Sequence, residues 1–175
     1  CPHYSMLDLV APLLQQAIGE FVISYRPNEN KELDKVICDG RERYGILINV
    51  RSIRGLVRHL KNGELVWFGP DQDMGPKGSV FAPFFGNPAC TVTTPSRLAK
   101  MSGCETFFLD LHREAGVYHM SFVPMPSGYP FSDEVRNATE LNNLIELALT
   151  KYPEQYMWMH RRFKTNPDQT RHTFY

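Results

Sequence analysis

The feature that most constrains the fold of this chain is an alternation of short β-rich runs with segments of helical periodicity. Apolar residues recur at helical spacing in some segments, and runs of β-branched and aromatic residues separate these segments. Such alternation predicts an α/β domain with a mixed, largely parallel central sheet flanked by helices. The elements predicted in the N-terminal part are a helix from Ser5 to Ile18, a strand over Phe21–Tyr25, a helix from Lys31 to Arg43, an apolar run over Ile46–Ile48, a helix from Ser52 to Asn62 and a strand over Leu65–Phe68.

Capping residues indicate where the first two helices begin. Ser5, with Asp8 three residues later, fits a capping box, and Asn30 fits the N-cap of the second helix. The C-terminal part is expected to add a helix from Thr94 to Gly103, strands over Thr106–Leu111 and Val117–Phe122 joined by a hairpin at Glu114-Ala115-Gly116, and a helix from Asp133 to Lys151 that ends before Pro153.

Composition limits the classes of protein to consider. The chain has 175 residues, 42% of them hydrophobic, which is enough for one buried core, so residues 1–175 are expected to form a single domain. Lysine plus arginine and aspartate plus glutamate number 19 each, so there is no overall basic field for nucleic acid. The four cysteines are far apart and lack zinc-site spacing, which favours reduced thiols in a cytosolic protein.

A histidine and an acid five residues apart form the first candidate for catalysis. His3 with Asp8 would provide a general base and a carboxylate that orients it, and His59 with Glu64 shows the same spacing. Because Glu64 follows the Gly63 helix stop, we expect the second pair not to meet. His3 precedes the first helix and is expected to fold back onto Asp8. The competing interpretation is that Asp8 only completes the capping box.

The glycine- and proline-rich loop after the strand Leu65–Phe68 is a second candidate, because ligands gather beyond the carboxyl ends of strands in α/β sheets. Asp71 and Asp73 in this loop would hold a divalent metal, as in sugar-nucleotide enzymes with a DxD motif. Alternatively, the acids fix a turn while Lys77 contacts a substrate phosphate.

Basic side chains supply the remaining candidates. Arg41 and Arg43 close the second predicted helix, where cations complement the helix dipole. Arg161 and Arg162, with Lys164 and nearby aromatic residues, would ordinarily be a solvated face. Their interleaving with apolar residues also suits contact with an anionic lipid surface or an acidic carrier protein, so they are expected to bind substrate or membrane.

Four segments together carry a resemblance to a known family. They are His3–Asp8, Tyr25–Asn28, Pro70–Phe81 and Pro153–Lys164. These segments closely resemble the late acyltransferases of lipid A biosynthesis, the lauroyl and myristoyl transferase family of Gram-negative bacteria, and the similarity extends over nearly the whole chain. Members begin with an N-terminal membrane helix, so the chain looks like a member that lacks its N-terminal part.

The resemblance implies a glycerolipid-acyltransferase-like fold and no metal or organic cofactor. It implies that His3 is the general base, that Asp8 is its partner, and that Arg41 and Asp71 match a functionally important arginine and aspartate. It also implies an acyl carrier protein as donor, a hydroxyl of a lipid A precursor as acceptor, and a location on the cytoplasmic face of the cell inner membrane.

Three other functions compete with this one. An acyltransferase of the same chemistry could use a glycerophospholipid or a mannosylated phosphoinositide as acceptor. A metal-dependent sugar-nucleotide transferase would use Asp71 and Asp73. A non-catalytic lipid-binding module would bind lipid and carrier without turnover.

Overall fold

The computed structural model describes residues 1–168, and the chain forms two compact units. The parallel-sheet unit consists of Met6–Phe68 and Met101–Cys104. The hairpin unit consists of Cys1–Ser5, Gly69–Lys100 and the described chain from Glu105 onward. Within residues 1–168, no helix combines the length and the apolar content needed to cross a bilayer.

The parallel-sheet unit alternates helices and strands as the sequence predicts. Its three strands lie in the order β2-β1-β3, and both neighbouring pairs are parallel. Its core includes Val10 and Leu14 from the first helix, Val22 and Ile23 from the central strand, and Leu56, all with no exposed surface. The elements in order are α1 (Leu7–Ile18), β1 (Val22–Tyr25), α2 (Lys31–Arg41), β2 (Ile46–Asn49), α3 (Ile53–Lys61) and β3 (Val66–Trp67).

The two predicted N-caps have different outcomes. The Asn30 side chain accepts hydrogen bonds from the backbone N–H groups of Glu32 and Leu33 at 3.0 and 3.1 Å, which confirms it as the cap of α2. The predicted cap at Ser5 is wrong, because α1 begins at Leu7 and no side chain caps it. Instead, the backbone N–H of Ser5 donates to the Gln155 carbonyl at 2.7 Å, as part of an extended segment.

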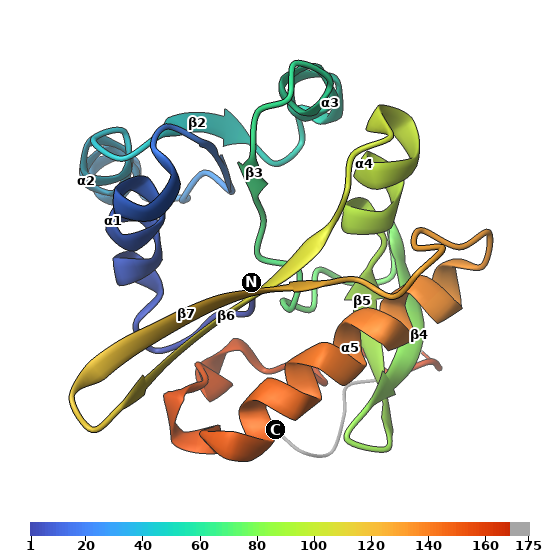
Figure 1. Cartoon of the computed structure of the whole chain (residues 1–175). Helices are drawn as coiled ribbons and strands as arrows, with labels where there is room; N and C mark the ends of the chain where they lie inside the picture. Colours follow the sequence, from blue (N-terminus) through green and yellow to red (C-terminus); the bar gives the residue numbers. More distant parts are fainter. Residues whose placement is uncertain (169–175) are drawn as a thin grey trace. The chain divides into compact units, whose positions relative to one another are not determined.

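The hairpin unit contains two antiparallel hairpins and the longest helix. The turn at Ala115 and Gly116 is confirmed, since both residues have positive φ and join the paired strands. Helix α5, orange in Figure 1, packs against β4. The elements are β4 (Ser79–Phe84), β5 (Asn87–Val92), α4 (Thr94–Ser102), β6 (Phe107–Glu114), β7 (Val117–Pro124), α5 (Glu134–Lys151) and the 3-10 turns η1 (Pro153–Gln155) and η2 (Trp158–His160). The last two residues of α4 belong to the parallel-sheet unit.

The mixed α/β class is confirmed, and the pairing is divided between sheets. Parallel pairing occurs in β1, β2 and β3, while β4–β5 and β6–β7 form separate antiparallel pairs in the described chain. The sequence did not predict the β4–β5 hairpin. Pro83 and Pro88, which face each other in its register, obscured the β-rich pattern because proline is rare inside strands.

Candidate active site

His3 is held in the hairpin unit by backbone pairing with the C-terminal segment. Tyr4 and Tyr156 form an isolated antiparallel bridge, and the backbone N–H of Met157 donates to the His3 carbonyl at 2.9 Å. The buried hydroxyl of Tyr4 donates to a carboxylate oxygen of Asp110 at 2.6 Å. These bonds fix the backbone on both sides of His3, so its imidazole projects from an anchored segment.

Asp71 is the carboxylate that contacts His3. One oxygen lies 2.6 Å from His3 Nδ1, and the other accepts the backbone N–H of His3 at 2.8 Å. The Asp71 side chain has no exposed surface, while 15% of the His3 side chain is exposed. Because a carboxylate accepts at Nδ1, that nitrogen carries a proton, and Nε2 holds a lone pair in the neutral form of the ring. This is the arrangement of a general base.

The surroundings keep Asp71 ionised. Burial alone would raise the pKa of Asp71, but the hydrogen bond and the charge of the His3 ring, together with the His3 backbone N–H, lower it below its ordinary value. The ionised Asp71 carboxylate lies 2.6 Å from His3 Nδ1, where it would stabilise the imidazolium that forms when His3 accepts a proton.

Gln72 and His160 surround the other side of the His3 ring. The side-chain nitrogen of Gln72 lies 3.3 Å from His3 Nε2 and 3.2 Å from His160 Nδ1. The two imidazole rings meet edge to face, with centroids 4.7 Å apart. Burial first, and then the nearby His3, lower the pKa of His160 below its ordinary value. A neutral His160 thus lies beside the candidate base.

Gly69 permits the close approach of the His3 ring. A Cβ atom at position 69 would lie 2.7 Å from His3 Cε1 and 3.2 Å from Nε2. Real Cβ atoms essentially never make a contact as short as 2.7 Å, so any side chain here would displace the imidazole or the loop.

Asp73, the second acid of the loop, holds the C-terminal segment. Its carboxylate is buried and accepts the backbone N–H of Gly75 and both the backbone N–H and the hydroxyl of Thr165, at 2.8 to 2.9 Å. The turn interpretation of the loop fits these contacts. Across residues 1–168, no three histidine, cysteine, aspartate or glutamate side chains are grouped in a way that could hold a metal ion.

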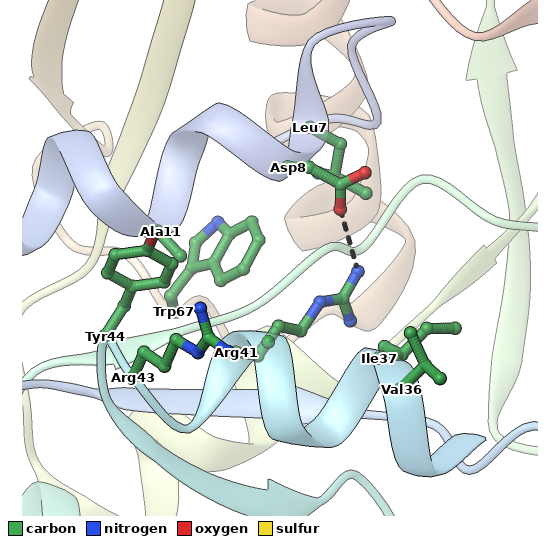
Figure 2. Close-up of a pocket in the computed structure, with 10 residues that line it drawn as sticks. Leu7, Asp8, Ala11, Val36, Ile37, Arg41, Arg43, Tyr44 and Trp67 are labelled. Carbon is green, nitrogen blue, oxygen red and sulfur yellow. Dashed lines mark ion pairs between the residues drawn. The ribbon is translucent and has the colours of Figure 1, made fainter. Parts of the chain in front are cut away.

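The parallel-sheet unit contains a pocket of about 320 Å³ between α1, α2 and the end of β3. Figure 2 shows Asp8 of α1 pointing toward Arg41 of α2, with an oxygen-to-nitrogen distance of 3.6 Å. The Asp8 side chain is 93% exposed, whereas that of Arg41 is 26% exposed. The residues that line the pocket are Leu7, Asp8, Ala11, Val36, Ile37, Gly40, Arg41, Arg43, Tyr44 and Trp67.

These contacts correct the histidine pairs predicted from spacing. His3 bonds to Asp71, and Asp8 pairs with Arg41, so the structure gives both members of the predicted pair other partners. His59 Nδ1, expected not to meet Glu64, lies 2.7 Å from its carboxylate. The reason is the helix end: Gly63 adopts a left-handed conformation and the Glu64 N–H bonds to the His59 carbonyl, which turns the chain back.

The basic tail is also corrected at one position. Arg162 is 2% exposed, and its guanidinium donates to the Cys90 carbonyl, the Thr91 hydroxyl and the Asn142 amide oxygen at 2.7 to 3.1 Å. It ties the tail to β5 and α5, so it is not available to a substrate or a membrane. Arg161 and Lys164 are exposed, as expected for a solvated face, and Lys77 is exposed too.

Sequence reasoning missed Gln72, His160 and Trp67 as site residues. Gln72 and His160 lie in the segments that carry the family resemblance, but no spacing rule connects them with His3. Trp67 ends a parallel strand directly before the candidate loop, and that position was an available signal.

Comparison with known proteins gives consistent matches. Residues 1–165 match the family model described as bacterial lipid A biosynthesis acyltransferase. The chain is 41% identical to the lipid A biosynthesis palmitoleoyltransferase of Escherichia coli K12, over 94% of this chain and 55% of that protein. It is 38% identical to the lauroyltransferase of the same strain, over 82% of this chain and 48% of that protein. A lipid A biosynthesis acyltransferase of Haemophilus influenzae is 35% identical, over 99% of this chain and 57% of that protein. The chain thus spans about half the length of these relatives.

Proposed function

The chain belongs to the bacterial lipid A biosynthesis acyltransferase family, and from this premise we propose that it transfers a fatty acyl group from a thioester carrier to a hydroxyl of a lipid A precursor. The observation that supports this chemistry best is the His3 imidazole, bonded through Nδ1 to the buried carboxylate of Asp71. A base that activates a hydroxyl needs a lone pair on one nitrogen and an orienting carboxylate on the other.

In the proposed mechanism, His3 Nε2 takes the proton of the acceptor hydroxyl as its oxygen attacks the thioester carbonyl. Asp71 stabilises the resulting imidazolium. The tetrahedral intermediate then collapses, the carbon–sulfur bond breaks, and the new ester remains on the lipid. The leaving thiolate takes the proton back from His3, so the base returns to its starting state.

Arg41 is proposed to stabilise negative charge on the substrate, either on the developing oxyanion or on a phosphate. Asp8 lies 3.6 Å from Arg41, so its proposed partner changes from the His3 imidazole to the Arg41 guanidinium. Because 93% of the Asp8 side chain is exposed, solvent weakens this ion pair.

Acyl carrier protein is proposed as the donor, and the cytoplasmic face of the inner membrane as the working surface. Exposed Arg161 and Lys164 accompany Trp158 and Met159, which are 48% and 80% exposed. Basic and large apolar side chains together suit a lipid interface or an acidic carrier. Lys77, exposed in the loop that contains Asp71, would contact a substrate phosphate.

The test compares two histidines that each contact a carboxylate. Initial rates of acyl transfer are measured by mass spectrometry, with membranes from cells whose only copy of the gene carries the substitution. His3→Ala should lower the rate about 100- to 10,000-fold, because it removes a positioned base. His59→Ala removes an equally short contact, to Glu64, and should retain most of the rate. Near wild-type turnover by a folded His3→Ala protein would refute the mechanism.

A further inference from the structure

We propose that the exposed basic face of α3 is the docking surface for the acyl carrier protein, an acidic partner. The basic face consists of Arg54, Arg58 and Lys61 on the helix and Arg51 directly before it. All four residues belong to the parallel-sheet unit. The inference rests on the proposed function for the identity of the partner, because the carrier is the acidic protein that the proposed reaction requires.

Positive charge is concentrated on one side of α3. Arg54, Arg58 and Lys61 follow one another at spacings of four and three residues, so they lie on the same face of the helix. No aspartate or glutamate occurs between Glu42 and Glu64. Because the whole chain has a formal net charge of zero, this face is a local positive region on a neutral protein.

The cations of the basic face have no intramolecular partners within residues 1–168. None of the four side chains makes a hydrogen bond or an ion pair with a described residue, whereas Lys35 on α2 pairs with Asp39 at 2.8 Å. Glu64, the first acid after α3, is bonded to His59 at 2.7 Å. The positive charge of the basic face therefore remains available to an acidic partner.

The arrangement is unfavourable for the helix itself. Like charges at spacings of three and four residues repel each other, and a cation in the first turn opposes the helix dipole. Arg54 lies in the first turn of α3, where no acidic residue compensates for it. A face that lowers the stability of its own helix fits a role in binding better than a role in folding.

The basic face begins at the edge of the sheet where ligands gather in α/β folds. Strands β1, β2 and β3 are parallel, so their carboxyl ends lie at the same edge. Helix α3 follows the carboxyl end of β2 and leads back to the start of β3 (Figure 1). Arg51 and Arg54 therefore lie near this edge, and the chain continues from the end of β3 into the loop that contains Asp71.

The basic face lacks the apolar side chains that anchor a helix in a lipid surface. Membrane-surface helices combine cations with large exposed apolar residues. Between Arg51 and Gly63, every large hydrophobic residue is buried or half-buried. In the basic tail, by contrast, Trp158 and Met159 are exposed. Charge without apolar anchors favours electrostatic docking of an acidic protein over insertion into a membrane.

The test measures binding of fluorescently labelled acyl carrier protein to the purified protein, which requires no turnover. Arg54→Gln combined with Arg58→Gln should weaken the affinity about tenfold at low salt and less at high salt, because salt screens exposed charges. Lys31→Gln combined with Lys35→Gln removes the same charge from exposed positions on α2 and should bind like the wild type. Equal affinities of the two double variants would overturn the proposal.

Three further measurements separate the carrier from other anions and binding from folding. Anionic vesicles should bind the Arg54 and Arg58 variant as they bind the wild type. A loss of vesicle binding with unchanged carrier binding would assign the face to the membrane and overturn the proposal. A polyglutamate peptide should bind at least about tenfold more weakly than the carrier. Equal binding of the peptide would reveal nonspecific attraction and contradict a docking surface. The thermal midpoint of the variant should not fall, because the substitutions remove repulsion between like charges.

The outcome is independent of the catalytic mechanism. If His3→Ala remained active while the Arg54 and Arg58 variant bound the carrier weakly, the mechanism would fail and the docking surface would stand. If His3→Ala were inactive and the variant bound the carrier like the wild type, the mechanism would stand and the docking surface would fail.

Discussion

His3 and Asp71 are separated by 68 positions in the sequence, and both carboxylate oxygens of Asp71 accept hydrogen bonds from His3. One bond comes from the ring and one from the backbone N–H. The carboxylate therefore fixes where the residue lies and how its ring is turned. A substitution at Asp71 is expected to change the orientation or the tautomer of His3 even if the fold is retained.

Asp71→Asn is expected to impair acyl transfer through the His3 tautomer. The asparagine oxygen can accept the His3 backbone N–H, but its NH₂ group would then face Nδ1 and favour the proton on Nε2, where the base needs its lone pair. We expect a loss of about 100- to 10,000-fold in the initial rate, measured as for His3→Ala. Asp39→Asn, an exposed change on α2, is the control and should have little effect. Similar rates for the two variants would contradict a role of Asp71 in orienting His3.

Gly69→Ala is expected to lower the rate by displacing the His3 ring. The added Cβ would lie 2.7 Å from His3 Cε1, and Gly69 is not among the glycines with positive φ, so the effect is steric. We expect at least about a tenfold loss, because misplacing a catalytic group by 1 Å can cost about 100-fold. Gly116→Ala, in the β6–β7 turn, adds a Cβ with nothing within 4 Å but strains a residue of φ 85°, so it controls for loss of stability at a glycine and should keep its activity while the protein is folded. If the Gly69→Ala protein transferred acyl groups at the wild-type rate, the close packing of Gly69 against the His3 ring would be excluded.

Arg162→Gln is expected to destabilise the hairpin unit. The buried guanidinium of Arg162 donates hydrogen bonds to acceptors on β5 and α5. Because the substitution removes these charged hydrogen bonds from the interior, it should lower the free energy of unfolding by about 2 to 4 kcal/mol. Urea unfolding followed by circular dichroism measures this change. Arg161→Gln, the exposed neighbour, should alter stability by less than about 0.5 kcal/mol. Equal losses of stability in the Arg162→Gln and Arg161→Gln proteins would contradict the structural role of the buried Arg162.

Local patterns predicted the fold better than the site. Helices such as α2 and α5 and the turn at Ala115-Gly116 depend on neighbouring residues, so periodicity and capping revealed them. The pairing of His3 with Asp71 depends on how distant segments fold together, and no spacing rule contains that information. Spacing selected Asp8 instead.

The same limit applies to the residues that were misassigned. His59 and Glu64 meet because Gly63, in a left-handed conformation, turns the chain back at the end of the helix. The prediction assumed that this helix stop would keep the two side chains apart. Arg162 lies in a basic run that resembles a solvated face, yet its side chain is buried. A run of charged residues indicates that a segment as a whole lies at the surface. It does not predict which single side chain of that segment is buried.

Replacing both Arg161 and Lys164 by glutamine is expected to weaken binding to anionic vesicles. Each basic residue near such a surface contributes about 1 kcal/mol, so the loss should be about 10- to 30-fold at low salt and smaller at high salt. Arg162 stays unchanged because it is structural. Sedimentation with vesicles that contain anionic lipid measures the affinity, and Arg58→Gln with Lys61→Gln on α3 provides a control of equal charge. Unaltered, salt-dependent binding of the Arg161 and Lys164 variant would remove this surface from membrane contact.

His160 is expected to make the stability of the protein depend on pH. Burial, followed by the nearby His3, lowers the pKa of His160, and the opposing effect of Asp71 is smaller. Above the ordinary histidine pKa of about 6.5, His160 is neutral in the folded and the unfolded chain. As the pH falls below that value, the unfolded chain binds a proton at His160 that the folded chain resists, so the free energy of unfolding decreases until the lower folded pKa is reached.

His160→Gln removes this titration. In urea unfolding between pH 7.5 and pH 5, the stability of the wild type relative to the variant should therefore decline as the pH falls, with most of the change below about 6.5. A difference that stayed constant over this range would show that the environment of His160 does not resist its protonation.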